Sequence, residues 1–378
     1  MKRLAMMLLA VLLASPAMAH KPSDAYLTIA RDGPALTGRW DVALRDLDLA
    51  LGLDRNGDGE ITWGEVRDKS EPIAALAMQR LAISSGGEKC ALRVSGLEID
   101  SHTDGTYAVL NLAGTCPHGG PTLAIEYSLL FDMDPQHRGL LNFVEGGESH
   151  SVVYSIDHAR QVVGGEAGGP MVQFMAYVHE GVWHIWLGFD HILFLLSLLL
   201  PAVLVRSDGK WQAAPDFKGS FWDVARIVTA FTVAHSITLT LAALGIVSLP
   251  SRWVESAIAL SVVLAALNNV FPIVERSRWI AAFAFGLLHG FGFAGALQDL
   301  GLPTGSLALS LAGFNIGVEL GQLAIVAAFL PVAFALRSTW AYRRVVLAGG
   351  SAVIVAIAGT WLVERAFDMP IFVALASG

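Results

Sequence analysis

The sequence predicts a multi-domain chain, in which a β-rich exported domain with an inserted helical segment precedes an all-α bundle of six membrane-spanning helices. Hydrophobic residues make up 54% of the chain and charged residues only 15%, which is outside the range of soluble proteins. Short alternating segments fill the first part of the chain, and long apolar stretches fill the second. The formal net charge of -8 argues against a nucleic-acid partner.

The first 19 residues have the pattern of a signal peptide. A basic start and an apolar run over residues 4–14 precede small residues at Ala17 and Ala19, where signal peptidase would cut. The apolar run is shorter than the roughly 20 residues that a membrane span needs. We therefore expect cleavage, with His20 as the new N-terminus.

The exported domain, residues 20–163, is predicted to be a β-sandwich because alternating segments recur between Gly, Asp and Pro turns. A helical segment, Leu44–Leu81, interrupts it. The expected strands are Tyr26–Ala30, Leu92–Ile99, Thr106–Leu112, Leu123–Phe131 and Ser151–Ile156.

The only two cysteines, Cys90 and Cys116, both lie in this exported domain. Export places them in an oxidising compartment, where paired cysteines form disulfides. We expect a disulfide between them; two buried free thiols are the alternative.

The inserted helical segment carries a loop, residues 54–65, with the ligand spacing of a calcium site. Oxygen donors stand at loop positions 1, 3, 5, 7, 9 and 12, and Gly59 stands at position 6, so the loop resembles an EF-hand loop. A lone loop of this kind predicts weak binding, with a Kd of about 0.1–1 mM, and a structural role. The expected ligands are Asp54, Asn56, Asp58, Glu60 through its carbonyl, Thr62 and Glu65.

Residues 171–366 contain six apolar stretches, each long enough to span a bilayer. The expected spans are Val182–Leu204, Phe221–Val247, Val254–Val274, Ile280–Leu297, Leu307–Phe334 and Val345–Val363.

Basic residues gather in alternate connecting loops, which the positive-inside rule assigns to the cytoplasm. The sequence therefore predicts a multi-pass inner-membrane protein in the lipid bilayer, with its exported domain and C-terminus in the periplasm. The basic loop residues are Arg206, Lys210, Lys218, Arg276, Arg278, Arg337, Arg343 and Arg344.

Histidines and carboxylates within the apolar stretches predict a site for a divalent metal ion near the membrane midplane. An ionisable group at this depth costs about 2.5–3.5 kcal/mol and usually faces a partner or a cavity. Neutral imidazoles suit nickel, cobalt, copper or zinc, and carboxylates offset the charge of the ion. The expected midplane residues are Asp190, His191, His235, His289 and Glu319, and His184, Glu255, Asn315 and Gln322 belong to the site or to an outer pathway.

Two alternatives remain open for the first stretch. On a continuous helix, two turns separate His184 from His191 by about 10.5 Å, too far for shared ligation. Either Gly188 breaks the helix or the two histidines belong to successive sites. Because neighbouring residues diverge on a helix, Asp190 is expected to orient His191 only from a different helix or through an intermediate group.

The segment from His184 to His191 has the pattern H-x5-D-H and resembles the signature of the HupE/UreJ family of hydrogenase- and urease-accessory membrane proteins. The resemblance covers about half the chain and includes His289-Gly-Phe-Gly-Phe-Ala294, while Ala234-His235-Ser236 is similar to an element of nickel and cobalt permeases. It implies nickel or cobalt uptake, with His184, Asp190 and His191 as signature residues. Ile185 departs from the proline common in shorter members, and the calcium-loop domain is not part of their compact pattern.

Transport, without enzymatic activity, is the leading hypothesis because polar residues occur at several depths. The alternative is a zinc-dependent intramembrane hydrolase, in which the metal activates water. Its site would use Asp190, His191, His235, Ser236 and His289. A passive membrane anchor would not need so many costly polar groups at depth.

Overall fold

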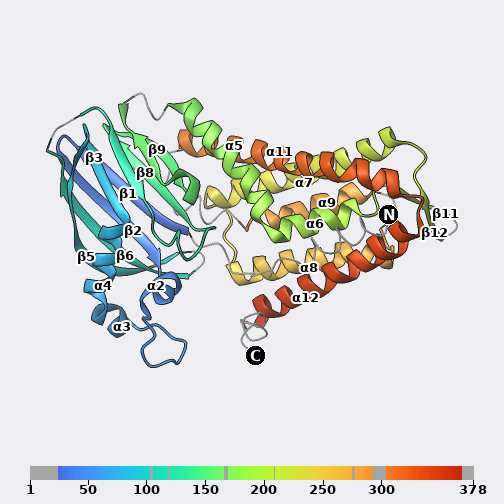
Figure 1. Cartoon of the computed structure of the whole chain (residues 1–378), viewed down its shortest axis with the longest axis horizontal. Coiled ribbons are helices and arrows are strands. Elements are labelled where there is room, and N and C mark those ends of the chain that lie inside the picture. Colours follow the sequence, from blue (N-terminus) through green and yellow to red (C-terminus); the bar gives the residue numbers. More distant parts are fainter. Residues whose placement is uncertain are drawn as a thin grey trace.

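The structure is a computed structural model, in which a β-rich part is followed by a helical part (Figure 1). The signal peptide and its cleavage site lie outside the described residues. The structure describes residues 24–102, 105–117, 120–165, 169–207, 209–274, 277–292 and 304–367.

The larger sheet of the β-rich part has six strands in the order β5-β6-β2-β1-β8-β9. Neighbouring strands are antiparallel except β1 and β8, which pair in parallel. The strands are β1 (Asp24–Asp32), β2 (Ala35–Ala43), β5 (Ala91–His102), β6 (Gly105–Thr115), β8 (Arg138–Glu145) and β9 (Glu148–Tyr154).

The smaller sheet has the order β10-β7-β3-β4, and both sheets contribute to one hydrophobic core. Trp40 of β2 contacts Tyr127 of β7 with ring centroids 5.5 Å apart. The predicted strand Leu123–Phe131 is too long, since β7 ends at Tyr127 and Leu130 has a left-handed φ of 59°, which a strand cannot accommodate. The strands are β3 (Leu81–Ser85), β4 (Glu88–Lys89), β7 (Leu123–Tyr127) and β10 (Arg160–Val163).

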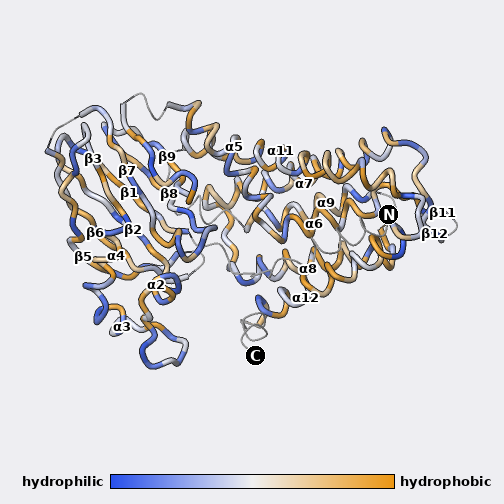
Figure 2. The backbone as a smooth tube through the Cα atoms, in the orientation of Figure 1, coloured by the Kyte–Doolittle hydropathy of each residue, from blue (hydrophilic) through white to orange (hydrophobic). Residues whose placement is uncertain are grey.

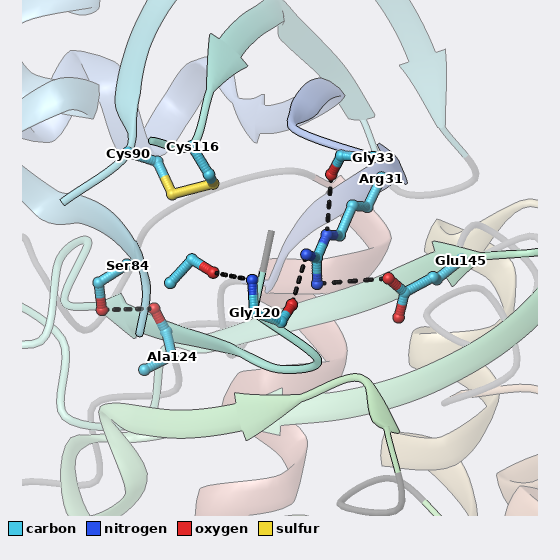
Figure 3. The surroundings of a disulfide bond; sticks show 9 residues. Arg31, Gly33, Ser84, Cys90, Cys116, Gly120, Ala124 and Glu145 are labelled. Atoms are coloured by element: carbon cyan, nitrogen blue, oxygen red, sulfur yellow. Dashed lines mark hydrogen bonds and ion pairs between the residues drawn. A yellow bond between two sulfur atoms is a disulfide. The ribbon is translucent and has the colours of Figure 1, made fainter. Parts of the chain in front are cut away.

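A disulfide joins Cys90, just before β5, to Cys116, just after β6, and so closes the open end of this strand pair (Figure 3). Arg31 lies nearby, where it donates to the carbonyls of Gly33 and Gly120 and lies 3.3 Å from a carboxylate oxygen of Glu145. These contacts tie β1, β8 and the segment before β7 together.

The inserted helical segment forms α2 (Leu44–Leu51), α3 (Trp63–Asp68) and α4 (Ser70–Arg80). Thr62 caps α3, because its hydroxyl accepts from the backbone N–H of Glu65 while the Glu65 carboxylate accepts from the backbone of Thr62. Figure 2 shows the loop between α2 and α3 as hydrophilic, whereas hydrophobic residues predominate along the helices of the second part.

Among the described residues, the helical part has four helices that are long and apolar enough to cross a membrane, or five if the bent pair α5–α6 counts as one span. Part of the predicted stretch Ile280–Leu297 lies outside the described residues, and the six-helix count stays a prediction. The helices are α5 (Pro170–Leu187), α6 (Phe189–Leu199), α7 (Phe217–Ala243), α8 (Ser251–Val270), α9 (Arg278–His289), α11 (Thr304–Leu336), the π-helix η3 (Tyr342–Gly349) and α12 (Gly350–Phe367).

Glycines let pairs of these helices approach closely. A Cβ at Gly317 of α11 would collide with the backbone of α5 at Val178, and one at Gly290 would collide with α7 at His235. Small residues at such crossings favour helix packing in membranes. The Gly290 crossing also brings His289 towards α7.

Arg337 and Arg343 bond to the segment that lies at the end of the helical part opposite the β-rich part (Figure 1). This end includes the hairpin of β11 (Leu204–Ser207) and β12 (Lys210–Ala213). Arg337 donates to the Ala214 carbonyl at 2.9 Å, and Arg343 donates to the Trp211 carbonyl at 3.3 Å. Positive charge is therefore concentrated at one end of the helices.

The other end of the helical part packs against the β-rich part. Ser151 of β9 and Tyr177 of α5 share a hydrogen bond of 2.6 Å between their hydroxyl oxygens. Ser306 of α11 donates to the carbonyl of Ser149 at 3.1 Å. Helices α5 and α11 are thus held to the sheet at the end where each begins.

Candidate metal site

The predicted first span is two helices that meet at Gly188 with a bend of 71°. A Cβ at this position would lie 2.6 Å from the carbonyl of His184 and 2.9 Å from Nδ1 of His191, so only glycine fits. The break brings the rings of His184 and His191 to a centroid distance of 4.6 Å. The helix therefore breaks at Gly188, and the two rings are in contact instead of two turns apart.

Asp190 contacts His191 directly, contrary to the expectation from helix geometry. Oδ1 of Asp190 lies 3.0 Å from Nδ1 of His191 and accepts from the backbone N–H of His191 at 2.9 Å. The contact is possible because both residues lie in the first turn of α6, where free backbone N–H groups favour a carboxylate.

This carboxylate sets the tautomer of His191. A carboxylate only accepts, so Nδ1 of His191 donates to it and Nε2 keeps its lone pair. Nε2 is buried and has no hydrogen-bond partner among the described residues. Histidines that ligate metals are commonly oriented by a carboxylate in this way.

Ser261 of α8 sets the tautomer of His289 by the same logic. Its hydroxyl donates to the Ile258 carbonyl at 2.6 Å, which uses its only proton. Its 3.0 Å contact with Nε2 of His289 must then be donated by the histidine. The lone pair of His289 is consequently on Nδ1, a buried atom with no hydrogen-bond partner in the described part of the chain.

His235 of α7 is fully buried, with 0% exposure, and neither of its ring nitrogens is hydrogen-bonded within the described residues. A neutral imidazole buried in this way leaves both a donor and an acceptor unsatisfied, which is costly and typical of functional sites.

The four histidines converge from α5, α6, α7 and α9, with His191 at the centre. Its ring centroid lies 5.2 Å from that of His289 and 6.3 Å from that of His235. Phe194 and Phe231 pack against His289 at 5.0 and 5.2 Å and give the cluster an apolar wall. Across the described ranges, no three His, Cys, Asp or Glu side chains share one metal coordination sphere. The histidines thus form a loose cluster.

Glu319 and Gln322 of α11 were also predicted to belong to the site. Both bond to α7, and among the described contacts neither is hydrogen-bonded to one of the four histidines. Glu319 accepts from the Thr229 hydroxyl at 2.8 Å through Oε1, and its buried Oε2 makes no hydrogen bond to a described residue. Gln322 accepts from the Thr232 hydroxyl at 3.2 Å. This second polar row could serve as a further station for a cation.

The remaining predicted residues have local partners. Asn315 donates to the Leu311 carbonyl of its own helix, and the Ser236 hydroxyl donates to the Thr232 carbonyl. Glu255 accepts from Ser251 and lies 4.0 Å from Arg365, at the start of α8. Ser261, Thr229 and Thr232 were missed, because a lone hydroxyl in an apolar stretch is equally typical of simple helix packing.

The predicted calcium loop joins α2 to α3 and is exposed. Asp54 accepts from the backbone of Gly57 and Gly59 at 2.7 and 2.9 Å, so its carboxylate lies inside the loop. Glu65 accepts from the backbone N–H of Arg55 at 3.1 Å, which folds position 12 back onto position 2. Gly59 has a φ of +81°, which favours glycine at the sharp turn.

The donor chemistry of this loop fits calcium. Carboxylate, amide, carbonyl and hydroxyl oxygens alternate along an exposed loop between two helices, as a hard cation requires. Backbone hydrogen bonds from Thr62 and Arg55 lower the pKa of Glu65, so this exposed group is a carboxylate at neutral pH.

Together, the apolar helices and the buried histidine cluster define a multi-pass membrane protein with a candidate cation site inside its helical part. A model of the HupE / UreJ protein family matches residues 160–365, more than half of the 378-residue chain. The chain belongs to this family, which is associated with nickel and cobalt transport. No curated protein matches the chain.

Proposed function

We propose that the protein is an inner-membrane permease for a divalent transition metal, nickel or cobalt, which passes through the cluster of His184, His191, His235 and His289. The observation that carries the proposal is the orientation of His191 and His289. Asp190 and Ser261 each hold one ring nitrogen as a donor, which leaves Nε2 of His191 and Nδ1 of His289 with lone pairs for a metal ion. Neutral imidazole nitrogens suit late first-row divalent metals.

The looseness of the cluster fits transport, because a cargo ion must be released as well as bound. Asp190 supplies a negative charge next to His191, where it offsets the charge of the ion. The row of Glu319 and Gln322 offers oxygen ligands to the ion on its way along α7 and α11. We place the β-rich part and the C-terminus in the periplasm, because the basic loops lie at the opposite end.

Uptake of nickel and cobalt by cells that express the protein tests this proposal. We expect His191→Ala, Asp190→Ala and His235→Ala each to abolish uptake, because each removes a ligand or its counter-charge from a site buried between apolar helices. Thr360→Ala in α12 is the matched control, because its hydroxyl bonds only to its own helix in the described contacts. Undiminished uptake by well-expressed His191 and Asp190 variants would refute the mechanism.

The loop of Asp54, Asn56, Asp58, Glu60, Thr62 and Glu65 is proposed as a structural calcium site. Support comes from the donor spacing and from the inward position of the Asp54 carboxylate. When bound, calcium would join α2 to α3 by neutralising the three carboxylates that the loop otherwise satisfies with backbone N–H groups.

A further inference from the structure

Two exposed histidines meet at the junction between the β-rich and helical parts. His158 ends the short helix η1 (Ile156–His158) of the β-rich part, and His179 belongs to α5. Their ring centroids lie 5.4 Å apart with the planes at 77°. The side chain of His179 is 47% exposed, so ions in the surrounding water can reach the pair.

We propose that His158 and His179 form a capture site for the divalent cargo, from which the ion moves along α5 to His184. The inference rests on the proposed transport function. It adds a ligand from the β-rich part, His158, which lies outside the segment matched by the family.

The spacing of the rings carries this proposal. Metal–nitrogen bonds of about 2.0–2.1 Å place two imidazole centres on one ion ~5 Å apart. The observed centroid distance of 5.4 Å is close to this value. Two imidazoles completed by water hold an ion less tightly than a full set of protein ligands, as a site that must pass its ion onward requires.

The polar neighbours of the pair fit a site that exchanges its ion. Nε2 of His179 accepts from Nε1 of Trp183 at 2.5 Å, and a bound ion would displace this hydrogen bond. Oε1 of Glu180 lies 3.8 Å from Nδ1 of His179, so this carboxylate is close enough to offset the positive charge of a bound ion. Arg138 lies 3.6 Å from the other oxygen of Glu180 and keeps this carboxylate from binding the ion tightly.

The position of His179 on α5 gives the captured ion a route. Trp183, which bonds to His179, immediately precedes His184, whose ring contacts His191. Displacement of the Trp183 hydrogen bond by the ion would free the side chain of the residue next to His184 in the sequence.

The test uses the purified full-length chain with calcium present and nickel as the probe. A background variant, His191→Asn with His235→Asn, removes two of the four histidines of the buried cluster and so weakens nickel binding there. We expect this background to bind nickel, and His158→Asn or His179→Asn within it to weaken this binding at least about tenfold. Ser95→Ala on β5, whose hydroxyl bonds to the Asn111 carbonyl of the neighbouring strand, should leave it unchanged.

Uptake measurements give the second readout. In the otherwise natural chain, His158→Asn should raise the half-saturating nickel concentration about tenfold and leave the maximal rate unchanged, because capture is impaired and passage is not. Unchanged nickel binding in the His158→Asn background would overturn the capture site. If the natural chain transports no metal, the transport proposal fails, while the binding comparison still decides whether the junction site exists.

Discussion

His184 and His191 face each other across a break in one membrane segment, with ring centroids 4.6 Å apart and planes at 64°. The conformation of Gly188 produces this contact, because the chain there is extended and the two helices differ in direction by 71°. Irregular backbone at membrane depth is tolerated where protein surrounds it or it lines a cavity. The break therefore belongs to the candidate site itself.

Gly188→Ala should disrupt the site, because the new methyl group would collide with the His184 carbonyl and with Nδ1 of His191. We expect metal uptake to fall at least about tenfold at normal expression. Gly359→Ala in α12 is the matched control, since a Cβ there meets nothing within 4 Å. Equal uptake by the two variants would mean that the break does not shape the site.

Ser261→Ala should weaken metal binding through His289, because the ring loses the acceptor that holds its proton on Nε2. Loss of such an orienting partner typically costs 10–100-fold in metal affinity, and we expect the half-saturating nickel concentration to rise by about this factor. Ser256→Ala, on the same helix, removes a hydroxyl that bonds only its own backbone in the described contacts, and it should behave like the natural chain. An unchanged half-saturating concentration in the Ser261 variant would remove Ser261 from the site.

Calcium should raise the melting temperature of the β-rich part, because a ligand that binds only the folded state stabilises it by about 1.4 kcal/mol at ten times its Kd. Asp54→Ala and Glu65→Ala should abolish this gain in thermal unfolding of the full chain. Glu60→Gln should keep it, because position 7 is expected to bind through its backbone carbonyl. The calcium assignment is wrong if millimolar calcium leaves the natural protein unchanged.

His137 should make the stability of the β-rich part depend on pH. Burial, with a smaller contribution from the charge of Arg138, lowers its pKa to about 3, whereas an unfolded histidine titrates near 6.5. The unfolded state therefore binds an extra proton between these values. Stability should be full above about pH 6.5 and fall with acidification towards pH 3, by at most about 1.4 kcal/mol per pH unit.

Thermal unfolding at pH 7 and pH 5 checks the role of His137. His137→Gln should flatten the pH dependence. Tyr127→Phe, which removes the 2.7 Å hydrogen bond to Nε2, should lower stability at both values and keep the slope, because the imidazole stays buried. A slope that survives His137→Gln would assign the effect to other groups.

Reporter fusions test the orientation in the membrane. We expect a reporter after Lys210 or Arg344 to be cytoplasmic, because both positions belong to the basic end of the helical part. A reporter after Gly378 should be periplasmic. A cytoplasmic C-terminus would contradict an even number of spans.

Much of the architecture follows from the sequence because its signals are local. Alternation predicts strands, and long apolar runs predict membrane helices, so a β-rich part followed by apolar helices could be anticipated. The parallel pairing of β1 with β8 could not, since Tyr26 and Leu140 meet across more than a hundred residues. The pattern of hydrophobic residues within a strand does not specify a partner so far away.

The sequence by itself determined which residues could bind a metal. An imidazole or carboxylate in an apolar stretch costs free energy whichever neighbour it faces, so its presence there marks a candidate ligand. Only the tertiary structure decided which of them meet. Gly188 could have continued a helix, in which case His184 and His191 would lie two turns apart. Ser261 contacts His289 only because α8 packs against α9. Glu255 lies beside Arg365 instead of the histidines. Such contacts depend on one residue's backbone angles and on how separate helices pack, and neither is encoded in local hydrophobic periodicity.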